Sequence, residues 1–218
     1  MWRQVAVAVI TLGSMFGFRT AAEPRPDLAG QATLTVSVFN DALVSEEVLS
    51  RARVEARSVM ADAGIALSWL DCGAPGRWVA NLGCGDLAFP THLSVRLVKN
   101  GSHRSGDTFG ESFLDDEGRG NYVSVYLQPL AASPAVGVVN EGDLLGYVIA
   151  HELGHLLLGP DSHSGSGLMH GVWQFADLRQ AAQGRLRFRR EESQRLQARL
   201  QSYRRQPEAR VSDRISGK

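Results

Sequence analysis

The chain has 218 residues, enough for one well-packed core and too few for two domains of ordinary size. Hydrophobic residues make up 44% of it, which is an ordinary value for a globular protein and does not favour an intrinsically disordered chain. The formal net charge is zero, but residues 23–184 carry ten basic and nineteen acidic side chains, whereas residues 185–218 carry eleven basic and four acidic ones. This distribution predicts an acidic folded body followed by a basic C-terminal helix and tail. We interpret the basic segment as a solvated helix face; contact with anionic lipid or nucleic acid is the alternative, and no nucleic-acid partner is expected.

The first 22 residues resemble an export signal. Arg3 places a positive charge near the start, residues 5–18 are nearly all apolar, and the small residues Ala21 and Ala22 precede a polar, Pro-rich segment. The apolar run is too short and too interrupted by Gly to predict a membrane span, which needs about 20 residues. We therefore expect cleavage after Ala22, an exported protein that is secreted or periplasmic, and no stable membrane span thereafter. A retained N-terminal anchor is the alternative.

The sequence next predicts a strand, a helix and a second strand. Residues 33–39 alternate apolar and polar side chains, which is typical of a strand. Ser45 is followed by two acidic residues, which predicts the start of a helix that runs to about Ala63 and ends at Gly64. Residues 65–70 read as the second strand.

Two cysteines, Cys72 and Cys84, flank a Gly-rich segment after the second strand. In an oxidising compartment, such a pair predicts a disulfide that closes the loop. A pair of free or metal-binding thiols is the alternative.

The remaining elements are three more strands and two helical regions. Residues 92–98 predict a third strand, residues 109–114 a short and weaker one, and residues 122–127 a further strand. A long helix is predicted from about Gly142 to Leu158, followed by an irregular segment to about Phe175 and then by more helix.

The long helix contains the sequence His-Glu-Leu-Gly-His at residues 151–155. Positions i and i+4 of a helix lie on one face, so His151 and His155 can reach the same metal ion. A zinc ion lowers the pKa of a water molecule that it holds, and Glu152 is then placed to take a proton from that water as it attacks a peptide carbonyl. The helix is otherwise apolar here, and polar groups set in a buried helix need a partner, which a metal supplies.

The helix is followed by Gly159-Pro160, by Asp161-Ser162-His163, and then by Met169. With the two helix histidines, a Gly that ends the helix, a further ligand in the loop and a Met downstream, the chain resembles the metzincin metallopeptidases over roughly residues 33–175. The resemblance implies an α+β fold: a twisted mixed sheet with two long helices, and a small, mostly helical C-terminal subdomain. It also implies a zinc peptidase, acting as an endopeptidase on peptide or protein substrates, with Met169 in a tight turn beneath the metal. We expect residues 23–184 to form the catalytic domain of a monomer.

The third ligand departs from the family pattern. Leu158 stands where the family has its Gly, Gly159 comes one place late, and the usual ligand position holds Asp161. We expect His163 to complete the zinc site, because the shifted Gly implies a longer loop and His is a common zinc ligand. Asp161 is the main alternative and His170 a further one. A thermolysin-like scheme would instead recruit Glu191 or Glu192.

The same resemblance assigns two binding features to the chain. The strand at residues 109–114 would pair with an extended substrate; an ordinary edge hairpin is the alternative. Val172, Trp173 and Phe175 would line a substrate pocket or pack against the C-terminal helices. Gly171 stands where some metzincins have a Tyr that stabilises the oxyanion. A catalytically silent zinc-containing module that binds peptides or surface partners is the competing function, and a purely structural zinc site, which needs four protein ligands, is a third.

Overall fold

The computed structural model describes residues 31–73, 83–100 and 108–216, with side chains up to Tyr203. The predicted export signal at residues 1–22 lies outside these ranges. Within them, no helix combines the length and the apolar character that crossing a membrane requires.

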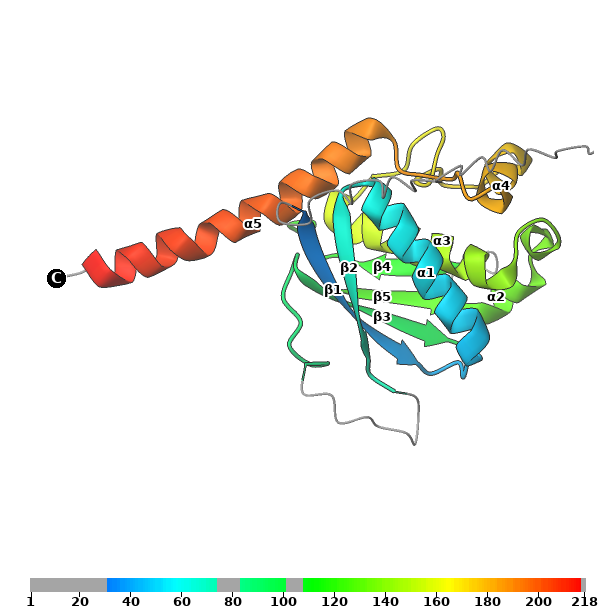
Figure 1. Cartoon of the computed structure of the whole chain (residues 1–218), viewed down its shortest axis with the longest axis horizontal. Coiled ribbons are helices and arrows are strands. Elements are labelled where there is room, and N and C mark those ends of the chain that lie inside the picture. The colour runs from blue at the N-terminus through cyan, green and yellow to red at the C-terminus, as the bar shows by residue number, and fades with distance from the viewer. Residues whose placement is uncertain (1–30, 74–82, 101–107, 217–218) are drawn as a thin grey trace, which may run out of the picture. The chain divides into compact units, whose positions relative to one another are not determined.

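Five strands form one mixed sheet, which confirms the predicted α+β class (Figure 1). The strand order is β2-β1-β3-β5-β4, and only the pairing of β4 with β5 is antiparallel. Apolar residues at alternate positions of each central strand are buried, as the period of two in the sequence predicts, and the intervening Ser37, Ser94 and Ser124 are buried as well. The strands are β1 (Ala32–Asn40), β2 (Ile65–Asp71), β3 (His92–Val98), β4 (Gly110–Phe113) and β5 (Tyr122–Tyr126).

Two long helices, α1 (Glu46–Asp62) and α3 (Glu141–Leu158), form the hydrophobic core together with the sheet. Ser45 caps the first turn of α1, and Asn140 caps that of α3. The two helices approach closely at Gly146, where a Cβ atom would lie 2.7 Å from the carbonyl oxygen of Ala52. The tight crossing presses α3, with the His-Glu-Leu-Gly-His segment, into the core, where all but His155 of that segment is buried.

Two short elements between β5 and α3 were not predicted. They are the helix α2 (Leu127–Ala132) and the 3₁₀ helix η2 (Pro134–Gly137). The predicted strand at residues 122–127 is therefore one residue too long, because Leu127 begins α2. Elements of four to six residues carry too few turns to produce a helical period in the sequence.

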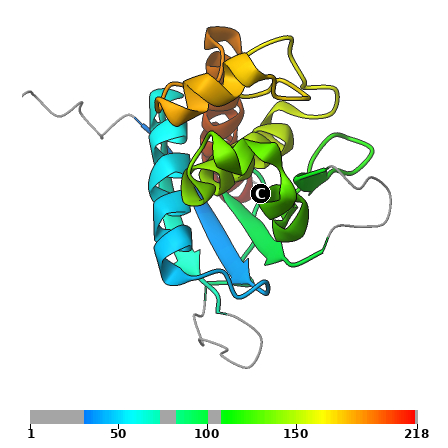
Figure 2. The same ribbon diagram turned by 90° about the vertical axis from the view of Figure 1, so that its right-hand side faces the viewer.

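The C-terminal part is helical, as predicted, and consists of α4 (Phe175–Ala182) and α5 (Arg190–Ser216). In both views α3 lies between the sheet and the segment that runs from α4 into α5 (Figures 1 and 2). Arg195 donates to the carbonyl oxygen of Leu158 at 3.0 Å, and Arg199 donates to that of Leu157 at 3.2 Å. The basic helix thus satisfies carbonyl groups left unpaired at the end of α3. The domain boundary after residue 184 stays a prediction.

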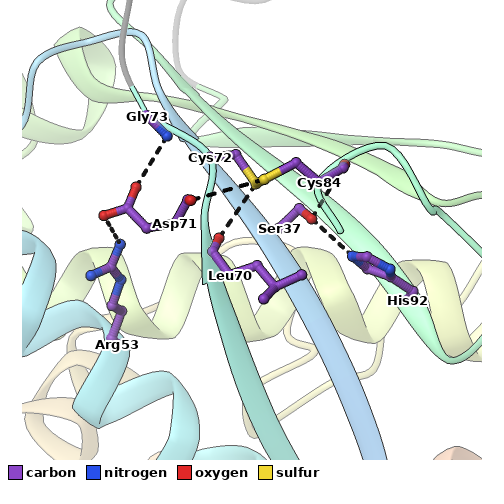
Figure 3. The surroundings of a disulfide bond; sticks show 8 residues. All are labelled: Ser37, Arg53, Leu70, Asp71, Cys72, Gly73, Cys84 and His92. Carbon is purple, nitrogen blue, oxygen red and sulfur yellow. Dashed lines mark hydrogen bonds and ion pairs between the residues drawn. A yellow bond between two sulfur atoms is a disulfide. The ribbon is translucent and has the colours of Figure 1, made fainter. Parts of the chain in front are cut away.

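The predicted disulfide between Cys72 and Cys84 is present and lies beside the end of β2 (Figure 3). Near it, Ser37 contacts Nε2 of His92 at 2.8 Å and lies 3.4 Å from the carbonyl oxygen of Cys84. The bridge therefore ties the segment before β3 to the end of β2, and the Ser37 hydroxyl ties the same segment to β1.

Candidate metal centre

Three histidines converge on one point at the surface of α3. His151 and His155 project from successive turns of the helix, and His163 comes from the loop that follows it. The Nε2 atom of His155 lies 3.0 Å from that of His151 and 3.1 Å from that of His163. Among the described residues, these three are the group of possible ligands whose donor atoms lie within 4.8 Å of one another.

Hydrogen bonds on the far side of the rings orient two of these imidazoles. Nδ1 of His151 lies 2.7 Å from the carbonyl oxygen of Leu168. A carbonyl can only accept, so this nitrogen carries the proton and Nε2 presents a lone pair to the centre. Nδ1 of His155 lies 2.7 Å from the hydroxyl of Ser162, which leaves its Nε2 facing the same point.

This donor set fits a zinc ion. A proton on one Nε2 atom can satisfy only one neighbouring nitrogen well, whereas a cation between the three rings can accept a lone pair from each of them. In the metal-free site, burial lowers the pKa of His151 to about 4 and, helped by the neighbouring histidines, lowers that of His155 to about 3. Both rings are therefore neutral near pH 7, which is the form that binds a metal.

The loop after α3 brings His163, and not Asp161, into the cluster. Gly159 ends the helix with a φ of 91°, and Asp161 adopts a φ of 54°, so the chain turns sharply twice within three residues. Gly171 lies on the other side of His163, and a Cβ atom there would be 3.1 Å from Nδ1 of the imidazole. A bare Cα at 171 therefore leaves room for the third ring.

The other ligand candidates do not join the cluster. Nδ1 of His170 contacts the buried carboxylate of Asp177 at 2.7 Å, and that carboxylate also caps α4 by accepting from the backbone of Gln174. Glu192 is buried and accepts from the backbone N–H of Arg189 at 2.7 Å, which caps the start of α5. Its role in the structure is that of a helix cap.

Met169 packs beneath the helix that carries the histidines. It is fully buried, and its sulfur would lie 2.7 Å from a Cβ atom at Gly154. The adjacent carbonyl of Leu168 accepts from both His151 and the indole N–H of Trp173. Trp173 also meets the His151 ring edge to face, with centroids 5.8 Å apart. The segment around Met169 thus supports the first histidine from below and from the side.

Glu152 lies next to the cluster with only 6% of its surface exposed. Burial is the main cause that raises its pKa to about 7, with a smaller contribution from the charge of Glu111, while the hydrogen bond from Ser112 opposes the rise. A carboxyl group with a pKa near neutrality can take up and release a proton under ordinary conditions.

The histidines and Glu152 open into a cleft of about 1210 Å³. Strand β4 contributes residues 110–113 to one wall, and residues 170–173 lie in the lining as well. Val172 is 72% exposed and Trp173 is partly buried, so the former faces solvent and the latter packs into the site. Sequence reasoning missed Ser112, Ser162 and the carbonyl of Leu168 as partners of the site, because a lone Ser or a backbone group gives no signal of its own.

The comparisons with known proteins give a distant likeness in structure only. No protein-family model and no curated protein matches the sequence. The chain is similar to archaemetzincin from Methanopyrus kandleri, with 14% identity, a TM-score of 0.47, and coverage of 78% of this chain and 97% of that one. It is also similar to metalloproteinase-II from Bacteroides fragilis, with 15% identity and a TM-score of 0.49; 80% of this chain covers 55% of that protein's length. At these values, neither likeness bears on the chemistry of the site.

Proposed function

We propose that the protein is a zinc-dependent peptidase of the metzincin type. The observation that carries this proposal is the convergence of three imidazole Nε2 atoms beside the buried Glu152, at the wall of an open cleft. Structural zinc sites usually fill four positions with protein ligands, whereas catalytic ones keep a position open. Three protein ligands among the described residues therefore favour a catalytic ion.

In this proposal His151, His155 and His163 hold Zn²⁺, which when bound supplies Lewis-acid polarisation of water and of the scissile carbonyl. Glu152 takes a proton from the attacking water as the new C–O bond forms. The same carboxyl group then delivers that proton to the nitrogen of the breaking C–N bond, so a carboxylic acid and an amine are released. Burial of this carboxyl group disfavours its charged form, which favours uptake of the proton from the water.

Peptide binding is assigned to the open edge of β4. In the part of the chain that the structure describes, this strand pairs with β5 on one side, is the last strand of the sheet, and lines the cleft. An extended peptide can add to such an edge through main-chain hydrogen bonds. Recognition of the main chain does not require a chain terminus, which supports an endopeptidase. The disulfide supports an oxidising compartment and hence export of the protein, which we propose acts as a monomer.

The deciding experiment compares the parent protein with Glu152→Gln, which keeps the shape of the side chain and removes its charge. Zinc content is measured by atomic absorption, and hydrolysis with fluorescein-labelled casein and a mixed peptide library. We expect about one zinc per chain in both proteins and cleavage by the parent alone. A parent that binds zinc and cleaves nothing in the library would favour the silent peptide-binding module. A parent without zinc would refute both functions.

A further inference from the structure

Strand β4 touches the proposed general base through two residues of the same face. The Ser112 hydroxyl lies 2.7 Å from Oε2 of Glu152 and 2.8 Å from its backbone carbonyl oxygen. Both are acceptors when the carboxyl group is ionised, so the hydroxyl donates to Glu152. Ser112 therefore ties the carboxylate to the strand that forms the cleft wall.

Gly110 lies two residues earlier on the strand, so it faces the same way as Ser112. A Cβ atom on Gly110 would lie 2.7 Å from Cγ of Glu152 and 2.9 Å from both Cδ and Oε1. Any side chain here would displace the carboxyl group. The bare Cα of Gly110 and the hydroxyl of Ser112 thus hold the two carboxylate oxygens of Glu152 in place from two positions on the same face of β4.

The main chain of the same two residues points to the open edge of β4. The N–H of Tyr126 donates to the carbonyl oxygen of Phe109 at 2.8 Å, which makes this antiparallel pair a hydrogen-bonded one. Hydrogen-bonded pairs alternate with non-hydrogen-bonded ones along such a ladder. Gly110 and Ser112 therefore stand in non-hydrogen-bonded pairs with β5, and their N–H and C=O groups point away from it.

We propose that β4 is the positioning element for Glu152: Ser112 and Gly110 hold the carboxylate with their side-chain face while their main chain receives the peptide. The inference rests on the proposed function, and Ser112 is a positioning residue because it acts through Glu152. A peptide that pairs with this edge binds to the same two residues that hold Glu152. These residues therefore position both the substrate and the general base. Displacing a reacting group by about 1 Å costs on the order of 100-fold in rate, so this positioning of Glu152 matters for turnover.

The test compares Ser112→Ala, Ser112→Thr and Gly110→Ala with the parent, and Ser202→Ala serves as the control. Ser202 is an exposed serine of α5 whose hydroxyl bonds within its own helix. We measure kcat and KM on fluorescein-labelled casein, and zinc affinity by competition with a chromogenic chelator. For Ser112→Ala we expect kcat to fall roughly 10- to 100-fold with KM and zinc affinity nearly unchanged. Threonine keeps the hydroxyl and should restore most of kcat, whereas Gly110→Ala should lower kcat at least as much as Ser112→Ala.

An unchanged kcat in Ser112→Ala would overturn the proposal. A loss of zinc affinity in step with kcat would also overturn it, because it would mean general damage to the site. A second readout does not depend on activity. It is the infrared band of the Glu152 carboxylate, measured at pH 9 in zinc-free protein by subtracting the spectrum of Glu152→Gln. Loss of the hydrogen bond should shift this band in Ser112→Ala. If the parent cleaves nothing, the proposed function fails, and this band alone decides: a shift upholds the positioning of Glu152 and no shift refutes it.

Discussion

Gly154 and Met169 fit together because one of them has no side chain. A Cβ atom on Gly154 would lie 2.7 Å from the sulfur of Met169 and 2.8 Å from the ring of Phe188. Both neighbours are buried, so neither can move into solvent to make room. The Gly of the His-Glu-Leu-Gly-His segment is thus required by the side chains of Met169 and Phe188, which pack against it.

Gly154→Ala should therefore destabilise the protein and weaken metal binding. Overpacking a filled core costs about 1–3 kcal/mol, and relief by moving Met169 would shift the neighbouring Leu168 carbonyl that orients His151. Urea denaturation of the zinc-free protein and chelator competition measure the two effects. Gly165→Ala is the matched control, since nothing lies within 4 Å of a Cβ atom there. Equal stability of the two variants would contradict the packing argument.

His163→Ala should lose zinc, whereas Asp161→Ala should retain it. Only the imidazole has its donor atom within reach of the other two ligands, and Asp161 is exposed in the loop. Removing one of three ligands should weaken zinc binding by more than the roughly 10- to 100-fold typical of losing a supporting hydrogen bond. Competition with a chromogenic chelator gives both affinities. If Asp161→Ala is the variant that loses zinc, the loop adopts another arrangement when the metal binds.

The two helix histidines could be predicted from the sequence because their geometry is local. A spacing of four residues on a helix fixes His151 and His155 on one face, whatever the rest of the chain does. The choice between Asp161 and His163 depends instead on loop dihedral angles, and the left-handed φ of Asp161 cannot be read from its residue type alone. We expected His163 from the late Gly, and the structure places it in the cluster.

The long-range partners of the site could not be predicted in the same way. Ser112 precedes Glu152 by 40 residues, and their contact depends on the register of β4 on the sheet and on how α3 crosses it. Residues 109–114 predict only a short, weak strand, and its place at the sheet edge follows from the resemblance to metzincins. Neither signal indicates which side chain of the strand meets the helix. Such contacts arise only when two elements pack together.

The raised pKa of Glu152 predicts that the free energy of unfolding of the metal-free protein depends on pH. In the unfolded chain this carboxyl group has a pKa of 4.5, and burial raises it to about 7 in the folded state. Folding thus favours the protonated form, so its contribution to stability is complete below pH 4.5 and is lost as the pH rises through 7. The loss is on the order of 3 kcal/mol above pH 7.

Glu152→Gln removes this titration, so the variant should gain stability relative to the parent as the pH rises. We compare the Tm of Glu152→Gln with that of the parent in chelator-treated protein. The difference between the two Tm values should be roughly 5–10 °C larger at pH 8 than at pH 5. The histidines of the cluster are present in both proteins and cancel in the difference. Adding zinc should shrink the difference, because a nearby cation favours the carboxylate. A difference that stays constant between pH 5 and pH 8 would show that the environment of Glu152 does not disfavour its charge.

The arginines of α5 should stabilise the helix that carries the proposed zinc ligands. Arg199 donates to the carbonyl of Leu157 and stacks over Phe89 at 5.6 Å, so it is held on two sides. A cation that bonds the last carbonyls of a helix also complements the helix dipole. Arg199→Ala should therefore lower the free energy of unfolding by about 1–2 kcal/mol. Urea denaturation followed by far-ultraviolet circular dichroism measures this change.

Arg199→Lys and Arg190→Ala separate the contributions to that effect. Lysine keeps the charge at the end of α3 but lacks the planar group that lies over Phe89, so it should recover only part of the loss. Arg190 is exposed at the first residue of α5, far along the helix from Arg199, and its removal should change stability by less than about 0.5 kcal/mol. If Arg199→Ala costs no more than Arg190→Ala, the basic helix does not stabilise the end of α3, and its charge is then a property of its solvated face alone.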